Sequence, residues 1–71
     1  MTMHRTLLKA VELQYIADKM KAEANLEVYL QNSAGVGEHS DIIAELKEMI
    51  MQIHDADGAI KILEKNYLEK E

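Results

Sequence analysis

The chain of 71 residues carries 13 acidic and 8 basic side chains, a formal net charge of -5, and no Cys, Pro, Trp or Phe. A chain of this length forms one domain at most, and without cysteine it can form neither a disulfide framework nor a thiolate metal site. The acid excess also removes the basic surface that nucleic acid or an anionic membrane would require, so we expect neither as a partner.

A first helix is predicted over residues 2–32, because residues 2–31 contain no Gly or Pro and are rich in good helix formers. Its apolar residues form two stripes at helical spacing. One stripe consists of Leu13, Ile16, Ala17, Met20, Ala24 and Val28, and the other of Leu8, Val11, Tyr15, Ala22, Leu26 and Tyr29. Two stripes suggest two partners, the second helix of the same chain and a second copy.

Self-association is assigned to the second of these stripes, because Tyr is enriched in protein interfaces. The residues assigned to it are Leu8, Val11, Tyr15, Leu26 and Tyr29. For the two tyrosines, packing within a single hairpin is the alternative.

Residues 33–40 are predicted to form the turn between two helices. Asn32 suits a left-handed C-terminal cap for the first helix, and Gly35 and Gly37 permit a positive φ. Ser40 suits the N-cap of the next helix, with Asp41 in its first turn. We therefore expect the second helix to run back along the first.

A second helix is predicted over residues 41–69, where apolar residues repeat at alternating steps of four and three. This spacing is a heptad pattern of four uninterrupted repeats and predicts the core face of the helix. Ile43 and Ile50 lie beside that face and widen it, so that more than one helix is needed to cover it. The predicted core residues are Ile42, Leu46, Met49, Ile53, Ala56, Ile60, Leu63 and Tyr67.

Gly58 offers an alternative to a continuous second helix, because a break over residues 55–58 would fold the last dozen residues back as a third helix. One Gly costs a helix only about 1 kcal/mol relative to Ala, too little to override the heptads. We therefore predict a continuous helix and interpret Gly58 as a point of close approach by a neighbouring helix.

Two such helices predict an all-α fold, an antiparallel two-helix hairpin that spans residues 1–71 as a single domain. One hairpin of this size buries little apolar surface. The doubled apolar surface of the first helix therefore predicts self-association, as a homodimer that forms a four-helix bundle or as a larger helical oligomer.

The sequence shows no pattern that indicates catalysis or a cofactor. Residues 53–64 match an EF-hand calcium loop at several positions, but Ile53 stands where that loop has its first Asp ligand, and the heptads require a helix there. His4, His39 and His54 stand in no metal-binding spacing. We therefore expect a non-enzymatic protein without a metal or cofactor.

Residues 29–42, with the sequence Tyr-Leu-Gln-Asn-Ser-Ala-Gly-Val-Gly-Glu-His-Ser-Asp-Ile, carry a resemblance to a known group of proteins. They are similar to the turn of small, uncharacterised helical-hairpin proteins of large tailed bacteriophages, in which a Val-Gly-Glu-His-(Ser/Pro)-Asp turn opens a second helix. The resemblance implies a helical hairpin made in an infected bacterial cell, and it implies no activity. Its turn signature would be Glu38, His39 and Asp41, which turn formation and helix capping also explain.

The leading hypothesis is a non-enzymatic protein–protein interaction module. Residues 32–71 hold nine acidic residues and four Lys, against four of each sign in residues 1–31, which favours a protein partner with a basic surface. If the phage resemblance holds, such a module would modulate a host or defence protein.

Two alternatives stay open, a structural part of a virion and an oligomeric sponge for a small molecule such as a nucleotide. Nucleotide binding needs cationic groups at a subunit junction, and the candidates are Arg5, Lys9, Lys19 and Lys21. The chain has no membrane-spanning run and no secretion-signal pattern, so we expect a cytoplasmic location, in the host cytoplasm if the protein is phage-encoded.

Overall fold

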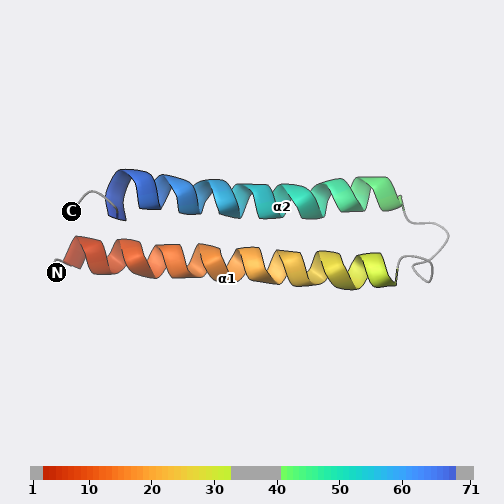
Figure 1. Cartoon of the computed structure of the whole chain (residues 1–71), viewed down its shortest axis with the longest axis horizontal. Coiled ribbons are helices and arrows are strands. Elements are labelled where there is room, and N and C mark those ends of the chain that lie inside the picture. Colours follow the sequence, from red (N-terminus) through yellow and green to blue (C-terminus); the bar gives the residue numbers. More distant parts are fainter. Residues whose placement is uncertain (1–2, 33–40, 69–71) are drawn as a thin grey trace.

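The computed structural model describes residues 3–32 and 41–68, which form an all-helical antiparallel hairpin (Figure 1). Helix α1 spans Met3–Gln31, and helix α2 spans Ile42–Leu63. A short π-helical turn, η2, continues α2 over Glu64–Leu68. The predicted helical hairpin is thus confirmed for the described residues, which contain no strand.

The helix ends that flank the turn are capped differently from the prediction. Asn32 is not left-handed, since no described non-glycine residue has a positive φ. Its Nδ2 instead donates to the carbonyl of Val28 at 2.9 Å and satisfies an acceptor at the end of α1. The N-cap of α2 is Asp41, whose Oδ1 accepts from the Ala44 N–H at 3.0 Å. Ser40, the predicted cap, lies outside the described residues.

The two helices meet along a single seam. On α2 the seam follows the predicted heptads, in which Ala56 and Leu63 are buried and the members from Ile42 to Ile60 are otherwise half-buried. On α1 the seam is a second heptad row, with alternating steps of three and four. Its members are Arg5, Leu8, Glu12, Tyr15, Lys19, Ala22, Leu26 and Tyr29.

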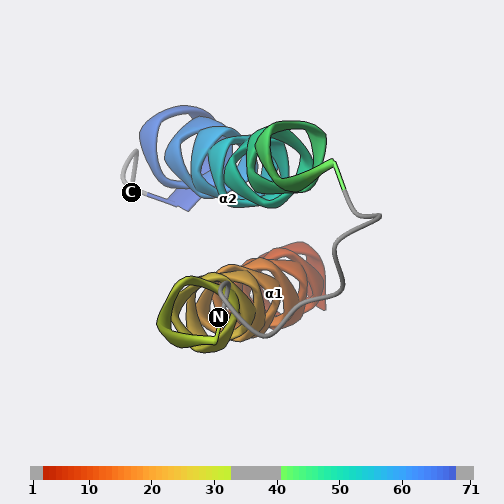
Figure 2. The same cartoon turned by 90° about the vertical axis from the view of Figure 1, so that its right-hand side faces the viewer.

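The hairpin is a rod 52 Å long and 14 Å across, a single layer of two helices (Figure 1, Figure 2). Its radius of gyration is 16.1 Å, against about 11 Å for a globular domain of this length. The buried apolar residues are Ala22, Ala56, Leu63 and Leu68. Because each helix is covered on one side only, a single hairpin has a small core.

The last turn departs from the heptad prediction. Tyr67, the predicted last core residue, is 57% exposed, whereas Leu68 is 8% exposed. The cause is η2, since a π-helix bonds each residue to the fifth residue along the chain instead of the fourth. Leu68 therefore lies on the same side of the helix as Leu63. The seam ends at Leu68 and not at the predicted Tyr67.

Helix α2 runs through Gly58 without the break that would have formed a third helix, as the heptads predict. A Cβ added to Gly58 would have no neighbouring atom within 4 Å, so α1 does not approach it closely. Its φ is not positive either. Within the hairpin, the interpretation of Gly58 as a point of close approach is therefore wrong, and no contact or backbone angle requires a glycine there.

Candidate functional site

Three charged residues of α1, Arg5, Glu12 and Lys19, lie in the seam at intervals of seven. Residues seven apart repeat on the same side of a heptad coil, so all three point toward the second helix. The Arg5 guanidinium donates from Nη1 to the Leu68 carbonyl at 3.1 Å and ties the start of α1 to the end of η2. A charged residue at such a position favours one register of the two helices over others.

Lys19 makes the central contact of the seam. Its Nζ lies 2.8 Å from Oδ1 of Asp57, and the Nζ of Lys61, one turn along α2, lies 3.0 Å from Oδ2 of the same carboxylate. Hydrogen bonds from Lys19 and then Lys61 lower the pKa of Asp57 to about 2, and the bond to Asp57 raises the pKa of Lys19. The Lys19 and Asp57 side chains are 33% and 32% exposed, so water screens the pair and its main effect is on register.

Glu12 is the least exposed of the buried residues, at 2%. Lys9, one turn earlier, places its Nζ 2.8 Å from Oε1 of Glu12, which is an ion-pair distance although the two groups are not aligned as a regular hydrogen bond. The Lys9 ammonium, followed by a hydrogen bond with the Glu64 side chain, holds the pKa of Glu12 below its usual value. A negative charge can be kept in the seam only beside a cation such as Lys9, because an unpaired buried charge is costly.

Tyr29 closes the seam at the turn end. Its hydroxyl donates to Oε2 of Glu45 in the first turn of α2. This hydrogen bond, followed by burial and by the charges of Glu45 and Asp41, raises the pKa of Tyr29 to about 12. The hairpin is therefore joined by polar contacts at both ends and in the middle.

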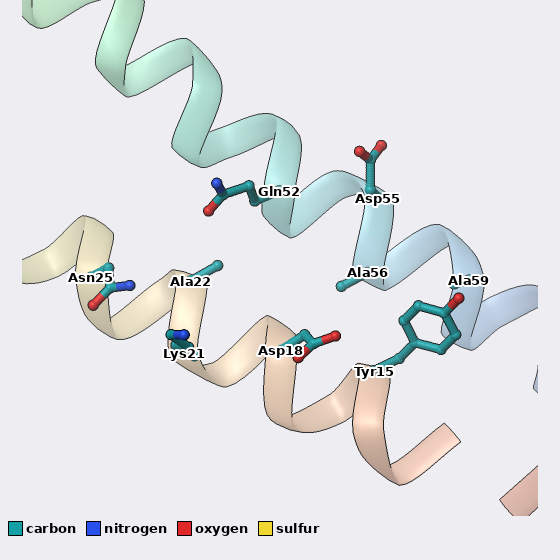
Figure 3. Close-up of a pocket in the computed structure, with 9 residues that line it drawn as sticks. All are labelled: Tyr15, Asp18, Lys21, Ala22, Asn25, Gln52, Asp55, Ala56 and Ala59. Carbon is teal, nitrogen blue, oxygen red and sulfur yellow. The ribbon is translucent and has the colours of Figure 1, made fainter. Parts of the chain in front are cut away.

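One side of the seam is a shallow groove of about 530 Å³ (Figure 3). Its floor contains Ala22 and Ala56, two buried small residues on opposite helices, and the Tyr15 ring reaches toward Ala59. The rest of the lining is polar, with carboxylates from both helices. It consists of Asp18, Lys21 and Asn25 of α1 and of Gln52 and Asp55 of α2.

The other side of the seam is apolar. Its position on α2 is given by the row that contains Asp57 and Glu64. These two residues contact Lys19 and Glu12 of α1. Ile50 and Ile43 precede Asp57 by seven and fourteen residues and lie in the same row, whereas the groove residues Gln52 and Ala59 form another row.

The α1 half of the apolar side lies one turn after the charged seam residues. Ile16 follows Glu12 by four residues, and Leu13 and Met20 precede and follow Ile16 on the adjoining row. We call the apolar side the set Leu13, Ile16, Met20, Leu30, Ile43 and Ile50. All six except the half-buried Ile16 are more than half exposed, and Ile43 is the most exposed at 68%.

The residues predicted for self-association lie mainly in the seam of the single hairpin. Leu8, Leu26 and Tyr29 are half-buried, while Tyr15 and Val11 are 37% and 43% exposed. Tyr29 thus packs within the hairpin, the alternative left open by the sequence. The first stripe of α1, not the second, is left uncovered by α2, with Leu13, Met20 and Val28 all exposed.

The four cations considered for nucleotide binding do not converge on one site. Arg5 bonds the end of η2, Lys9 pairs with Glu12, and Lys19 pairs with Asp57. Lys21 lines the groove, as Asp18 does. Within one hairpin, three of the four are therefore engaged in contacts, and those of Arg5 and Lys19 join the two helices.

Of the turn signature, Glu38 and His39 lie outside the described residues, and Asp41 acts as the N-cap of α2. Residues 53–63 are helical, so they do not form a calcium loop. Over residues 3–32 and 41–68, no group of three or more His, Asp or Glu side chains is arranged to hold a metal ion. Neither helix in this part of the chain combines the length and apolarity needed to cross a bilayer.

The charged seam residues of α1 were missed by the sequence reasoning. A search for apolar stripes passes over Arg5, Glu12 and Lys19, although their seven-residue spacing continues to Leu26 and interleaves with Leu8, Tyr15, Ala22 and Tyr29. A charged row in heptad register with an apolar row is the signal that would have located the seam.

Comparison of the chain with protein-family models, with curated proteins and with solved structures finds no match.

Proposed function

We propose that the protein is a non-enzymatic protein–protein interaction module that self-associates. The observation that supports this most is the balance of apolar surface in one hairpin. Among residues 3–32 and 41–68, the buried apolar residues are two alanines and two leucines, whereas thirteen large apolar side chains are exposed. Single exposed apolar residues are ordinary, but a row of them on one side of a rod is typical of an interaction surface.

The mass of the folded protein in solution tests self-association. Light scattering at about 100 μM is expected to give a mass of two chains or more, where one chain is 8.1 kDa. Circular dichroism on the same sample checks that the chain is helical. A fully helical protein with the mass of one chain at this concentration would overturn the proposal.

The polar groove is the surface to which a protein partner with basic groups would bind. Its carboxylates, Asp18 and Asp55, come from both helices, and Tyr15 provides an aromatic face against which a cationic side chain can pack. Binding to such a partner from bacterial lysate should weaken as salt is raised, because the charges are exposed. Asp18→Lys should abolish that binding, and partner capture that Asp18→Lys leaves intact would exclude the groove.

A phage-encoded modulator of a host or defence protein is the form of this proposal that the turn resemblance suggests. The nucleotide alternative draws no support from a particular contact, since three of the four candidate cations are paired within the hairpin. A thermal-shift panel of nucleotides separates it from the main proposal, and mass spectrometry of purified virions separates the structural alternative. A shift of several degrees with one nucleotide would favour the small-molecule sponge instead.

A further inference from the structure

We propose that a second copy of this chain covers the apolar side, with α1 of each copy lying beside α2 of the other. This inference rests on the self-association proposed above and specifies its surface and its geometry. The dimer would be a four-helix bundle in which neighbouring helices are all antiparallel. The polar groove, on the opposite side of the seam, stays open.

The size of the apolar side fits an interface between two hairpins. A flat face of a rod 52 Å long and 14 Å wide has an area on the order of 700 Å², close to the roughly 800 Å² that each partner contributes to a stable protein interface. The apolar residues occupy about 26 Å of this length, the 17-residue rise of helix from Leu30, which lies beside Ile43 at the turn end, to Leu13 toward the open end. A second hairpin is long enough to cover all of them.

The turn end of this side also has a hollow. Asp41, Ile43, Ala44 and Lys47 line a shallow depression of about 380 Å³ on α2. The depression lies beside Ile43, the most exposed member of the apolar side, where the small side chain of Ala44 leaves space. An apolar side chain from a second copy could fill it.

The charges beside the apolar residues decide which helices face each other. On α1 this side carries Glu23 and Glu27, and on α2 it carries Lys47. Glu27 and Lys47 have no partner among the described residues, whereas the charge of Glu23 acts on Lys19 within α1. Further along α2 the same row holds His54 and Lys61. Packing α2 against its own copy would place Lys47 and Lys61 opposite the same lysines of the partner subunit, whereas packing α1 against α2 places Glu27 opposite Lys47.

A two-fold axis parallel to the helices produces this pairing, and it brings together residues that lie at the same height along the rod. Within one hairpin Tyr29 contacts Glu45, so Glu27 and Lys47, each two residues further from the turn, lie at one height along the rod. The two-fold rotation preserves that height and therefore brings Glu27 to the level of Lys47 of the partner subunit. Leu30 and Ile43 of both copies meet in the same way at the turn end.

Ile50→Glu tests the face, and Met51→Glu is the matched control. The two neighbours are 56% and 54% exposed, but only Ile50 lies on the apolar side. Burying a carboxylate at Ile50 should raise the dimer dissociation constant at least about 100-fold, and Met51→Glu should leave it within about threefold, as measured by sedimentation equilibrium. If the unaltered chain is a folded monomer, the proposed function fails with this inference. If it dimerises and Ile50→Glu dimerises equally well, self-association stands and the assigned face is wrong.

The helix pairing has a second test that introduces no charge into the interface. The chain has no cysteine, so Glu27→Cys and Lys47→Cys each create a single thiol. After the two variants are mixed and treated with a short thiol-specific cross-linker, we expect mixed dimers in clear excess over either homodimer. Mass spectrometry distinguishes the three products. An excess of one homodimer, or no cross-linked product from a dimeric sample, would overturn the pairing of α1 with α2.

Discussion

The carboxylate of Asp57 receives an ammonium group from each helix, Lys19 of α1 and Lys61 of α2. Its pKa is about 2 in the folded chain, below the ordinary value of 3.8, because both contacts favour the charged form. A group whose pKa is lowered by folding stabilises the fold fully above its unfolded pKa. That contribution is lost as the pH falls toward the folded pKa.

We therefore expect the thermal midpoint of the protein to fall as the pH is lowered from about 4 to about 2. Asp57→Asn should flatten this dependence and lower the midpoint at neutral pH, as followed by circular dichroism. Asp55→Asn is the matched control, because the Asp55 side chain is 72% exposed and its ion-pair contact is with its neighbour His54, not with α1. An acid dependence as large in Asp57→Asn as in the unaltered chain would show that other groups, such as Glu12, cause it.

Tyr29 behaves in the opposite sense, because folding raises its pKa from 10.0 to about 12 through the hydrogen bond to Glu45. Its contribution is complete below pH 10 and is lost as the pH rises toward 12. Tyr29→Phe should remove the part of the alkaline loss of stability that lies between these values, measured by urea denaturation at each pH. Tyr67→Phe, at an exposed position, should leave it unchanged. Equal alkaline profiles for all three proteins would contradict the Tyr29–Glu45 contact.

At the scale of the elements, α2 contains a glycine that its structure does not require. Gly58 has an ordinary φ and open space around its missing Cβ. Gly58→Ala should therefore raise the free energy of unfolding by about 1 kcal/mol, the propensity difference between the two residues in a helix. Ala17→Gly on the exposed face of α1 should lower it by a similar amount. A destabilised Gly58→Ala chain would show that a second copy approaches Gly58 closely.

The π-helical turn makes a separate prediction at the end of the seam. Leu68→Ala should lower the free energy of unfolding by about 2 kcal/mol, because it removes a buried side chain. Tyr67→Ala should change it by less than about 0.5 kcal/mol, since Tyr67 is exposed. Continuous heptads would give the reverse order. Denaturation of the two variants at one protein concentration therefore distinguishes η2 from a regular α-helical end.

The whole molecule is a rod with one seam, and self-association would couple its folding to its concentration. If two chains unfold together from the dimer, a tenfold increase in concentration stabilises the dimer by about 1.4 kcal/mol and raises Tm by about 4 °C. Calorimetry over a hundredfold range of concentration measures this. Ile50→Glu should reduce the dependence, whereas Met51→Glu should retain it. A constant Tm of the unaltered chain would contradict a dimer that unfolds as one unit.

The sequence alone determined the two helices, the approximate positions of their ends and the heptad face of the second helix. These features depend on neighbours within one or two turns, such as the absence of Gly and Pro over residues 2–31 and the steps from Ile42 to Leu63. Local propensity and apolar periodicity carry that information. The strength of the heptads was also enough to predict that α2 continues through Gly58.

Only the tertiary structure decided which face of α1 meets α2 and which sides of the seam are polar or apolar. Arg5, Glu12 and Lys19 resemble surface residues in the sequence because their partners, Leu68, Glu64 and Asp57, stand far away along the chain. The exchange of Tyr67 for Leu68 has a local cause instead, the i to i+5 bonding of η2, which the heptad pattern does not encode. Pairing between distant segments, and not local periodicity, therefore left Leu13, Met20, Ile43 and Ile50 uncovered on the surface assigned to a second copy.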